Sequence, residues 1–345
     1  MTPDLQEIRE SLRRYYGQKL KTASDLAVAA CCTDETARRF GDVLRLIPEE
    51  VKKKQYGCGS PIPMDDLKGL EVVDFGCGAG TDAFVASKLV GETGRVTGLD
   101  MTDEQLDVGR RATPSVMKRF GLAAPNVEFR KDYIEVADTV PDGSVDLVIS
   151  NCVINLSPRK DLVFGTIHRI LREGGELYVS DIVADRRLPD DVRSLGDPYY
   201  SECLTGAEYQ GDLRDIMEEA GFRDVRIVSR TVLDEKVGKE AAQFYSLTLR
   251  GFKLTDPVLD RRCEDYGQFA TYTGGMEESP VFFELDEGHT FERDRPAPVC
   301  RNTAWMLSRT RLARYFQVTE PVKHFGIFDC APRTASGEMP PTGCC

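Results

Sequence analysis

The chain has 345 residues, 41% hydrophobic and 30% charged, which is enough for one large domain or two ordinary ones. This balance excludes collagen-like, disordered and coiled-coil proteins. The 45 basic and 57 acidic residues give a formal net charge of −12, which disfavours binding to nucleic acids or anionic membranes. Eleven cysteines, against three histidines and one tryptophan, are the unusual feature of the composition.

The amino terminus and the hydropathy pattern predict a cytoplasmic protein. The first eleven residues carry four charges and lack the apolar stretch of a secretory signal. No apolar run approaches the roughly 18 residues that a membrane span needs. Thiols stay reduced in the cytosol, so the cysteines are expected either to fill the core or to act as soft ligands.

In chain order, two helical segments, 5–20 and 34–56, are expected first, with a loop over 21–33 between them. Short apolar runs then alternate with helical patterns. We expect strands over 71–75, 95–99, 127–130, 145–150, 176–181 and 224–229. We expect helices over 82–90, 103–118, 159–172 and 205–220. This alternation predicts a doubly wound α/β fold with a mostly parallel sheet covered on both faces.

Local signals set the expected helix ends. Thr102 and Gln105 form a predicted capping box at the start of one helix. Pro114 is expected to kink or split that helix. The pair Gly174-Gly175 is expected to close the helix before it.

The alternating pattern ends near residue 235, where the texture of the sequence changes. We therefore divide the chain into an N-terminal helical extension with thiol loops (1–60), an α/β domain (61–235), a smaller α+β C-terminal domain (236–330) and a flexible tail with a vicinal cysteine pair (331–345).

A glycine-rich loop follows the first predicted strand, from Asp74 through Gly76, Gly78 and Gly80. Glycines allow a sharp turn and a close approach to a ligand, and the following helix offers unpaired N–H groups. Asp100 ends the second strand, where a carboxylate can accept both hydroxyls of a ribose. These features predict a nucleoside cofactor. A nicotinamide or flavin dinucleotide is disfavoured, because the third glycine of its fingerprint is absent.

This arrangement resembles the class I S-adenosylmethionine-dependent methyltransferases, which have a Rossmann-like fold. The resemblance implies that the glycine loop packs on the methionyl part of the donor, that Asp100 binds its ribose, and that the adenine lies near Asp132. It implies donor contacts at Asp74, Gly76, Gly78, Gly80, Asp100, Met101, Tyr133, Ile134 and Asn151.

Several cysteines lie in segments that do not resemble core: Cys31-Cys32, Cys58, Cys152 and Cys203. Ligands of open α/β sheets bind outside the carboxyl ends of the strands, and Cys152 follows a central strand. The other cysteines lie in segments that could cover the same edge. Zinc is disfavoured, since no CxxC pair or suitably spaced histidine occurs. Core filling remains an alternative, and a site for a soft, thiophilic substrate atom is favoured.

The strings YGCG, DFGCGAG, GLDM, SNCVINL, GGELYVSD and ECL occur in this order over roughly residues 10–235. In order and spacing they resemble the arsenite S-adenosylmethionine methyltransferases. The resemblance implies four acting cysteines: Cys31, Cys58, Cys152 and Cys203. It places trivalent arsenic at the last three, and Cys32 is an alternative to Cys31.

This resemblance also implies the activity and its partners. The chain is expected to methylate arsenite, or its glutathione conjugate, to mono- and dimethylated arsenicals for detoxification. Thioredoxin or glutathione is the expected reductant, Cys31 and Cys58 the hypothesised redox pair, and a monomer the expected state. The alternatives are a methyltransferase for a small organic acceptor and a thiol-based metalloid-binding protein without enzymatic activity.

The remaining candidates receive weaker assignments. Glu202 either positions a thiol or water or is a solvated charge, and the sequence favours the second. Tyr56 either lines the donor pocket or packs on the N-terminal helix. Structural roles are expected for Cys77, Cys263, Cys300 and Cys330, and Cys344-Cys345 is a candidate for arsenic capture.

Overall fold

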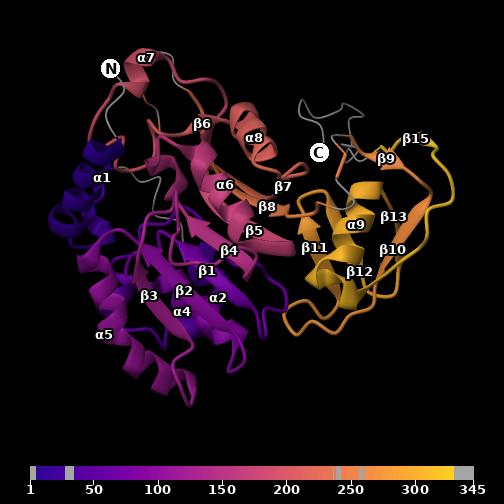
Figure 1. Cartoon of the computed structure of the whole chain (residues 1–345), viewed down its shortest axis with the longest axis horizontal. Helices are drawn as coiled ribbons and strands as arrows, with labels where there is room; N and C mark the ends of the chain where they lie inside the picture. Colours follow the sequence, from indigo (N-terminus) through magenta and orange to yellow (C-terminus); the bar gives the residue numbers. More distant parts are fainter. Residues whose placement is uncertain are drawn as a thin grey trace.

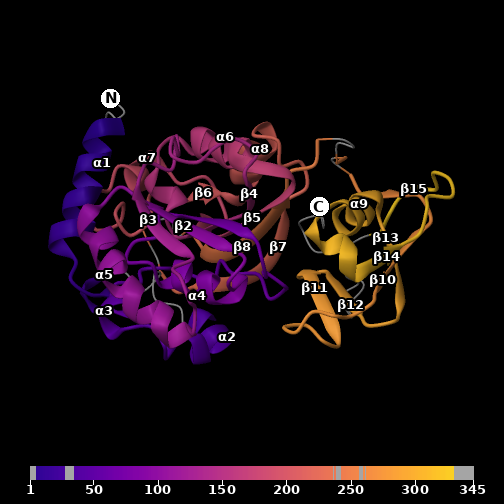
Figure 2. The same cartoon turned by 60° about the horizontal axis from the view of Figure 1, so that its bottom comes forward.

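The structure is a computed structural model that describes residues 5–27, 35–235, 237, 242–255, 259, 260 and 262–329. Its main body is a twisted sheet with helices on both faces, and a smaller C-terminal unit lies to one side (Figures 1 and 2). Helix α1 lies at the end of the molecule opposite that unit in both views. Within the described ranges, no helix is both long and apolar enough to span a membrane.

The main sheet contains eight strands in the described part of the chain, in the order β3-β2-β1-β4-β5-β8-β7, with β6 paired to β5. Their bounds are β1 (Glu71–Phe75), β2 (Arg95–Asp100), β3 (Val127–Lys131), β4 (Val145–Asn151), β5 (Leu171–Ala184), β6 (Glu208–Tyr209), β7 (Arg226–Leu233) and β8 (Phe244–Phe252). The first five strands run parallel, and β8 runs antiparallel to both β5 and β7. The carboxyl ends of β1, β2, β4 and β5 therefore share one edge of the sheet.

Alternating side chains of the central strands enter two separate cores. Val72 and Leu147 belong to the core that is shared with α4 and α5. Val73 and Val148 belong to the core that is shared with α6 and α8. This period of two explains why each strand reads as an almost continuous apolar run.

The helices fall into an N-terminal group and a group that covers the sheet. The N-terminal group is α1 (Leu5–Arg14), the π-helix η1 (Tyr15–Lys19), the 3₁₀ helix η2 (Ala23–Asp25), α2 (Glu35–Leu44) and α3 (Glu49–Lys52). The covering group is α4 (Thr81–Val90), α5 (Asp103–Phe120), η4 (Ile154–Leu156), α6 (Lys160–Ile170), α7 (Asp190–Arg193) and α8 (Gln210–Glu219).

In its described residues, the C-terminal unit combines short antiparallel strands with an α-helix and a 3₁₀ helix around its own core. Its elements are β9 (Glu264–Asp265), β10 (Gln268–Tyr272), β11 (Phe282–Asp286), β12 (His289–Glu292), β13 (Pro296–Val299), α9 (Arg301–Arg309), η5 (Arg311–Tyr315), β14 (Phe316–Val318) and β15 (Gly326–Ile327). The order β13-β10-β14 forms the largest of its sheets in the described residues.

Strand β8 changes the expected division of the chain at residue 235. It pairs along its whole length with β5 and also with β7, so it is a strand of the main sheet. The segment 236–330 therefore contributes one strand to the main body before it forms the C-terminal unit. The sequence of residues 243–254 is β-like, but it could not place this strand in the main sheet, because strand pairing depends on a distant partner.

Three local expectations also differ from the structure. Gly174-Gly175 lies inside β5, where both glycines pair through their backbones with Lys253, and not at the end of a helix. Pro114 lies within the single helix α5 and does not split it. Thr102 precedes α5 without a capping bond from its side chain, and Gln105 instead donates to the Tyr16 carbonyl at 2.8 Å.

Candidate active site

A cavity with about 1040 Å³ of empty space, its open mouth included, lies at the carboxyl edge of β1, β2 and β4. Of the nine predicted donor contacts, eight line it: Asp74, Gly76, Gly78, Asp100, Met101, Tyr133, Ile134 and Asn151. Gly80 is not among the lining residues. It caps the start of α4 with φ of +93°, and a Cβ there would lie 2.4 Å from the Phe129 ring.

In the glycine loop, backbone atoms without side chains form part of the cavity wall. Gly78 has φ of +54°, and nothing lies within 4 Å of the position that a Cβ would take, so a side chain there would fill space that now belongs to the cavity. The Gly78 amide donates to Asp100 Oδ2 at 2.9 Å, and the Thr102 amide donates to Oδ1 at 2.8 Å. These two bonds fix the carboxylate of Asp100 at the cavity wall.

Buried carboxyl groups are concentrated at this wall. Burial raises the pKa of Asp74 well above its usual value, and the neighbouring Asp82 and Asp100 raise it further. Burial also raises the pKa of Asp82 to about 6, although a bond from Asn151 opposes this. Among the described residues, Asp74 Oδ2, Asp82 Oδ1 and Thr81 Oγ1 are buried and have no hydrogen-bond partner. Such atoms suit a cationic or hydrogen-bonding ligand.

The N-terminal helix α1 closes one side of the cavity. Its Arg9 guanidinium lies 3.9 Å from the centre of the Tyr133 ring and pairs with Glu135 at 2.8 Å. Tyr16 and Tyr56 both line the cavity, and their ring centres are 5.6 Å apart. Tyr56 therefore has both of the roles considered from the sequence: it lines the pocket, and it packs against the N-terminal segment.

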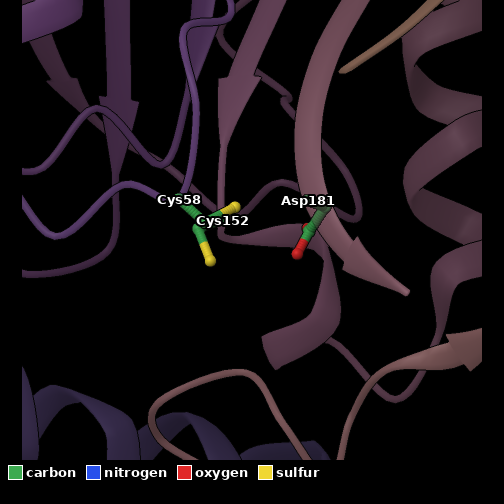
Figure 3. A group of neighbouring side chains, drawn as sticks. All are labelled: Cys58, Cys152 and Asp181. Atoms are coloured by element: carbon green, nitrogen blue, oxygen red, sulfur yellow. The ribbon is translucent and has the colours of Figure 1, made fainter. Parts of the chain in front are cut away.

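Two of the predicted thiols meet beside this cavity. The sulfurs of Cys58 and Cys152 and a carboxylate oxygen of Asp181 lie within 4.8 Å of one another, and all three residues are buried. Figure 3 shows the two cysteines side by side, with the Asp181 carboxylate facing them from β5. Cys152 lines the donor cavity, so this group adjoins it.

Asn151 connects the thiols to the donor cavity. Its Oδ1 accepts the Cys58 and Gly59 amides at 3.1 and 3.2 Å, and its Nδ2 donates to Asp82 Oδ2 at 2.8 Å. The segment before β1 is also held by Ser246, whose hydroxyl donates to the Cys58 carbonyl at 2.6 Å. A single side chain at the end of β4 thus positions both the Cys58 segment and the buried acidic wall.

Cys203 lies next to Cys152 in a different arrangement. Its thiol donates to the Cys152 carbonyl at 3.0 Å, and its side chain is fully buried. Both residues adopt positive φ, +58° for Cys152 and +69° for Cys203, which residues other than glycine rarely do. Backbone strain of this kind concentrates at functional sites, because the surrounding structure must hold it in place.

Glu202 is not the solvated charge that the sequence favours. It is fully buried and accepts the Tyr15 hydroxyl at 2.5 Å and the Ala27 amide at 2.9 Å. Both donors come from the N-terminal extension, so Glu202 anchors that extension beside Cys203. The sequence could not reveal this role, because both partners are about 180 residues away.

The sequence also missed Asp181 and Arg9. The one available signal for Asp181 was a carboxylate inside the apolar strand LYVSDIVA, where an acidic residue needs a specific reason. The predicted Cys31 and its alternative Cys32 lie outside the described residues, as do Cys330, Cys344 and Cys345. Cys263 is disulfide-bonded, and Cys300 caps the start of α9 by accepting the Thr303 amide at 3.5 Å.

Comparison with known proteins identifies the family. The sequence matches the methyltransferase domain family over residues 66–221. It is 43% identical to the arsenite methyltransferase of Aquipseudomonas alcaligenes, over 93% of this chain and 94% of that protein. It is 35% identical to the arsenite methyltransferase of Homo sapiens, over 90% of this chain and 84% of that protein. The chain belongs to the arsenite methyltransferase family.

A solved structure of the family supports the fold. The arsenic(III) S-adenosylmethionine methyltransferase of Chlamydomonas reinhardtii matches with a TM-score of 0.79 and 41% identity, over 84% of this chain and 98% of that chain. The fold of this arsenite methyltransferase family member is therefore the expected class I methyltransferase fold, with a mostly parallel central sheet.

The cavity fits the donor of such methyltransferases. S-adenosylmethionine carries a ribose and two positively charged groups, an ammonium and a sulfonium. The carboxyl groups of the buried acidic wall can pair with such cations, and the partnerless oxygens of Asp74 and Asp82 offer acceptors. Gly78 leaves room beside the Asp100 carboxylate, which is fixed for the ribose.

Proposed function

We propose that this chain transfers methyl groups from S-adenosylmethionine to trivalent arsenic held by cysteine thiolates, giving mono- and dimethylated arsenicals. The observation that carries the proposal is the meeting of two buried thiols, Cys58 and Cys152, beside a cavity suited to the donor. The names of the full-length relatives agree with this substrate.

The ligand set follows from the chemistry of arsenic. Trivalent arsenic is soft and prefers thiolate sulfur to oxygen or nitrogen. We propose Cys58, Cys152 and Cys203 as its ligands. The arsenic would reach them as free arsenite or as an arsenic–glutathione conjugate. Three sulfurs leave arsenic pyramidal, with one lone pair whose direction the rigid, strained backbone of Cys152 and Cys203 helps to fix.

The donor side supplies the other reactant. S-adenosylmethionine, when bound, supplies an electrophilic methyl group to the arsenic lone pair. The chain holds it with the glycine loop, Asp100 and the buried acidic wall, while α1 covers one side. Because both reactants are fixed, proximity and orientation are the main contribution, and such alignment supplies up to about 7–11 kcal/mol in favourable cases. No general base is needed, because the nucleophile is a lone pair.

The redox balance explains the fourth cysteine. Methylation raises arsenic formally from the trivalent to the pentavalent state, so two electrons must return before the next methylation. We propose that the Cys31 thiol attacks the sulfur of arsenic-bound Cys58. The S–S bond forms, the As–S bond breaks with its electron pair staying on arsenic, and Cys31 releases one proton. Thioredoxin or glutathione then reduces the disulfide, which requires a reducing compartment such as the cytoplasm. We propose that the chain works as a monomer without zinc.

Serine variants of the thiols test this proposal. Wild-type protein with arsenite, radiolabelled donor and thioredoxin or glutathione should give labelled arsenicals. Cys152→Ser and Cys203→Ser should each lose about 100-fold or more, because a misplaced reactant alone costs that much. Cys300→Ser is the matched control, since Cys300 is equally buried but caps α9 in the C-terminal unit. Transfer of label to a small organic acceptor, undiminished in the Cys152 variant, would refute the proposal.

A further inference from the structure

Asp181 faces the two meeting thiols, and the methylation chemistry described above assigns it no role. Asp181 is 6% exposed, and one of its carboxylate oxygens lies within 4.8 Å of both the Cys58 and Cys152 sulfurs. The group of three that the described residues form contains Asp181 in the place expected for Cys203, whose thiol is bonded to the Cys152 carbonyl.

The backbone holds this carboxylate firmly in position. Asp181 Oδ1 accepts the Ile182 amide at 2.8 Å, and Oδ2 accepts the Asn155 amide at 3.2 Å. Asp181 follows Ser180, whose carbonyl accepts the Cys152 amide at 2.8 Å, so β5 aligns it with the end of β4. A carboxylate offers about four acceptor positions in total, so it can also bond a hydroxyl of a bound substrate.

We propose that Asp181 binds the hydroxyl that remains on arsenic after Cys58 and Cys152 have captured arsenite. This inference rests on the proposed function. Arsenous acid has three hydroxyls, and each thiol exchanges for one of them. Each exchange forms an As–S bond, breaks an As–O bond and releases one water made from the hydroxyl and the thiol proton. Arsenic stays trivalent, and one hydroxyl is left.

An arsenic atom between the two sulfurs lies within reach of Asp181. Its remaining hydroxyl would donate to the carboxylate, and hydrogen bonds to an ionised acceptor are about twice as strong as neutral ones. Cys203 would exchange for this hydroxyl last, once its thiol leaves the Cys152 carbonyl, and would release a third water. Asp181 thus holds the captured substrate until the third sulfur arrives.

This role separates two substrates of the same enzyme. Monomethylated trivalent arsenic has only two hydroxyls, and both are lost when two thiols bind it. Its third substituent is a methyl group, which donates no hydrogen bond. Asp181 therefore contributes to the binding of arsenite and not to the binding of the monomethylated form.

Calorimetric titration of the full-length chain with each arsenical tests the inference. Asp181→Ala should raise the arsenite dissociation constant about tenfold or more, as expected for the loss of a hydrogen bond to a charged group. The dissociation constant for monomethylarsonous acid should stay within about twofold. Asp181→Asn keeps the shape and one acceptor oxygen, so it should show a smaller arsenite defect with the same selectivity.

Two controls make the outcomes distinguishable. Asp185→Asn removes a carboxylate just beyond the end of the same strand, outside the cavity lining, and should change neither constant. Binding of S-adenosylhomocysteine reports whether each variant is folded. If Asp181→Ala does not fold, the arsenical selectivity of Asp181→Asn tests the inference instead. Equal weakening for both arsenicals would mean that Asp181 only supports the backbone, and the inference would be wrong. Failure of the wild-type chain to bind arsenite would overturn the proposed function instead.

Discussion

The buried carboxylates of the donor cavity show how single residues are tuned by their surroundings. Asp74, Asp82 and Asp100 are placed together by two strand ends and the first turn of α4, and burial raises the pKa of each. In the absence of a cationic ligand this arrangement costs stability. The cavity is thus built for its ligand and not for the stability of the free protein.

Asp82 provides a test with a defined sign. Its folded-state pKa of about 6 lies above the ordinary value of 3.8, so its protonated form favours folding. That contribution is fully present below about pH 4 and is lost as the pH rises through 6. Asp82→Asn does not titrate, so its free energy of unfolding relative to wild type should rise by about 2 kcal/mol between pH 4 and pH 7. Urea denaturation at stepped pH measures this difference.

Asp161 supplies a control of opposite sign. It is exposed on α6, and its bond from Arg159 lowers its pKa. A carboxyl of this kind stabilises the fold above its unfolded pKa and loses that effect as the pH falls. Asp161→Asn should therefore lose stability relative to wild type as the pH rises. Parallel pH profiles for both variants would contradict the assignment for Asp82.

Residues with local signals could be predicted, and those defined by distant partners could not. The glycine loop, Asp100, Cys58 and Cys152 stand in recognisable local contexts, and the structure places them around one cavity and its neighbouring thiols. Glu202 has an ordinary surface context in sequence, and only the fold brings Tyr15 to it. Asp181 likewise comes close to the two thiols only because β5 pairs with β4.

Among the elements, the short parallel strands β1 to β4 were predicted best. The strand 71–75 has the predicted bounds, and the ends of β2, β3 and β4 differ by one residue. Their apolar runs are bounded by glycine or charge, which defines both ends. The start of β5 was missed because Gly174-Gly175 has the composition of a helix end. The structure uses these glycines for close approach, since a Cβ on Gly174 would lie 2.9 Å from the Arg309 carbonyl oxygen.

Gly174→Ala should therefore damage the contact between β5 and the end of α9. Gly174 has φ of +75°, and the clash is with backbone, which cannot move away cheaply. We expect a loss of about 1–3 kcal/mol in the free energy of unfolding, measured by urea denaturation. Gly165→Ala is the matched control, because Gly165 lies within α6 with nothing within 4 Å of a Cβ. It should be neutral or stabilising by up to about 1 kcal/mol. An equal loss in both variants would contradict this explanation.

At the level of the whole molecule, a buried network of charges joins the main sheet to the C-terminal unit. Arg250 of β8 bonds Glu176 of β5 and Asp65, each at 2.6 Å. Arg311 of η5 bonds the same two carboxylates, at 2.5 Å to Glu176 and 2.8 Å to Asp65. Two cations and two carboxylates thus balance one another out of water. The sequence predicted a separate C-terminal unit, but this network forms only when segments 246 residues apart meet.

Removal of one cation should break this balance. Arg311→Ala leaves Asp65 and Glu176 buried with only Arg250 between them, and such uncompensated charge costs about 3–5 kcal/mol. Urea denaturation should show that loss, and hydrogen exchange should show faster opening of α9. Arg314→Ala is the control, because its pair with Asp66 is half exposed and is worth less than about 1 kcal/mol. If the two variants lost the same stability, the network would not be what holds the C-terminal unit against the sheet.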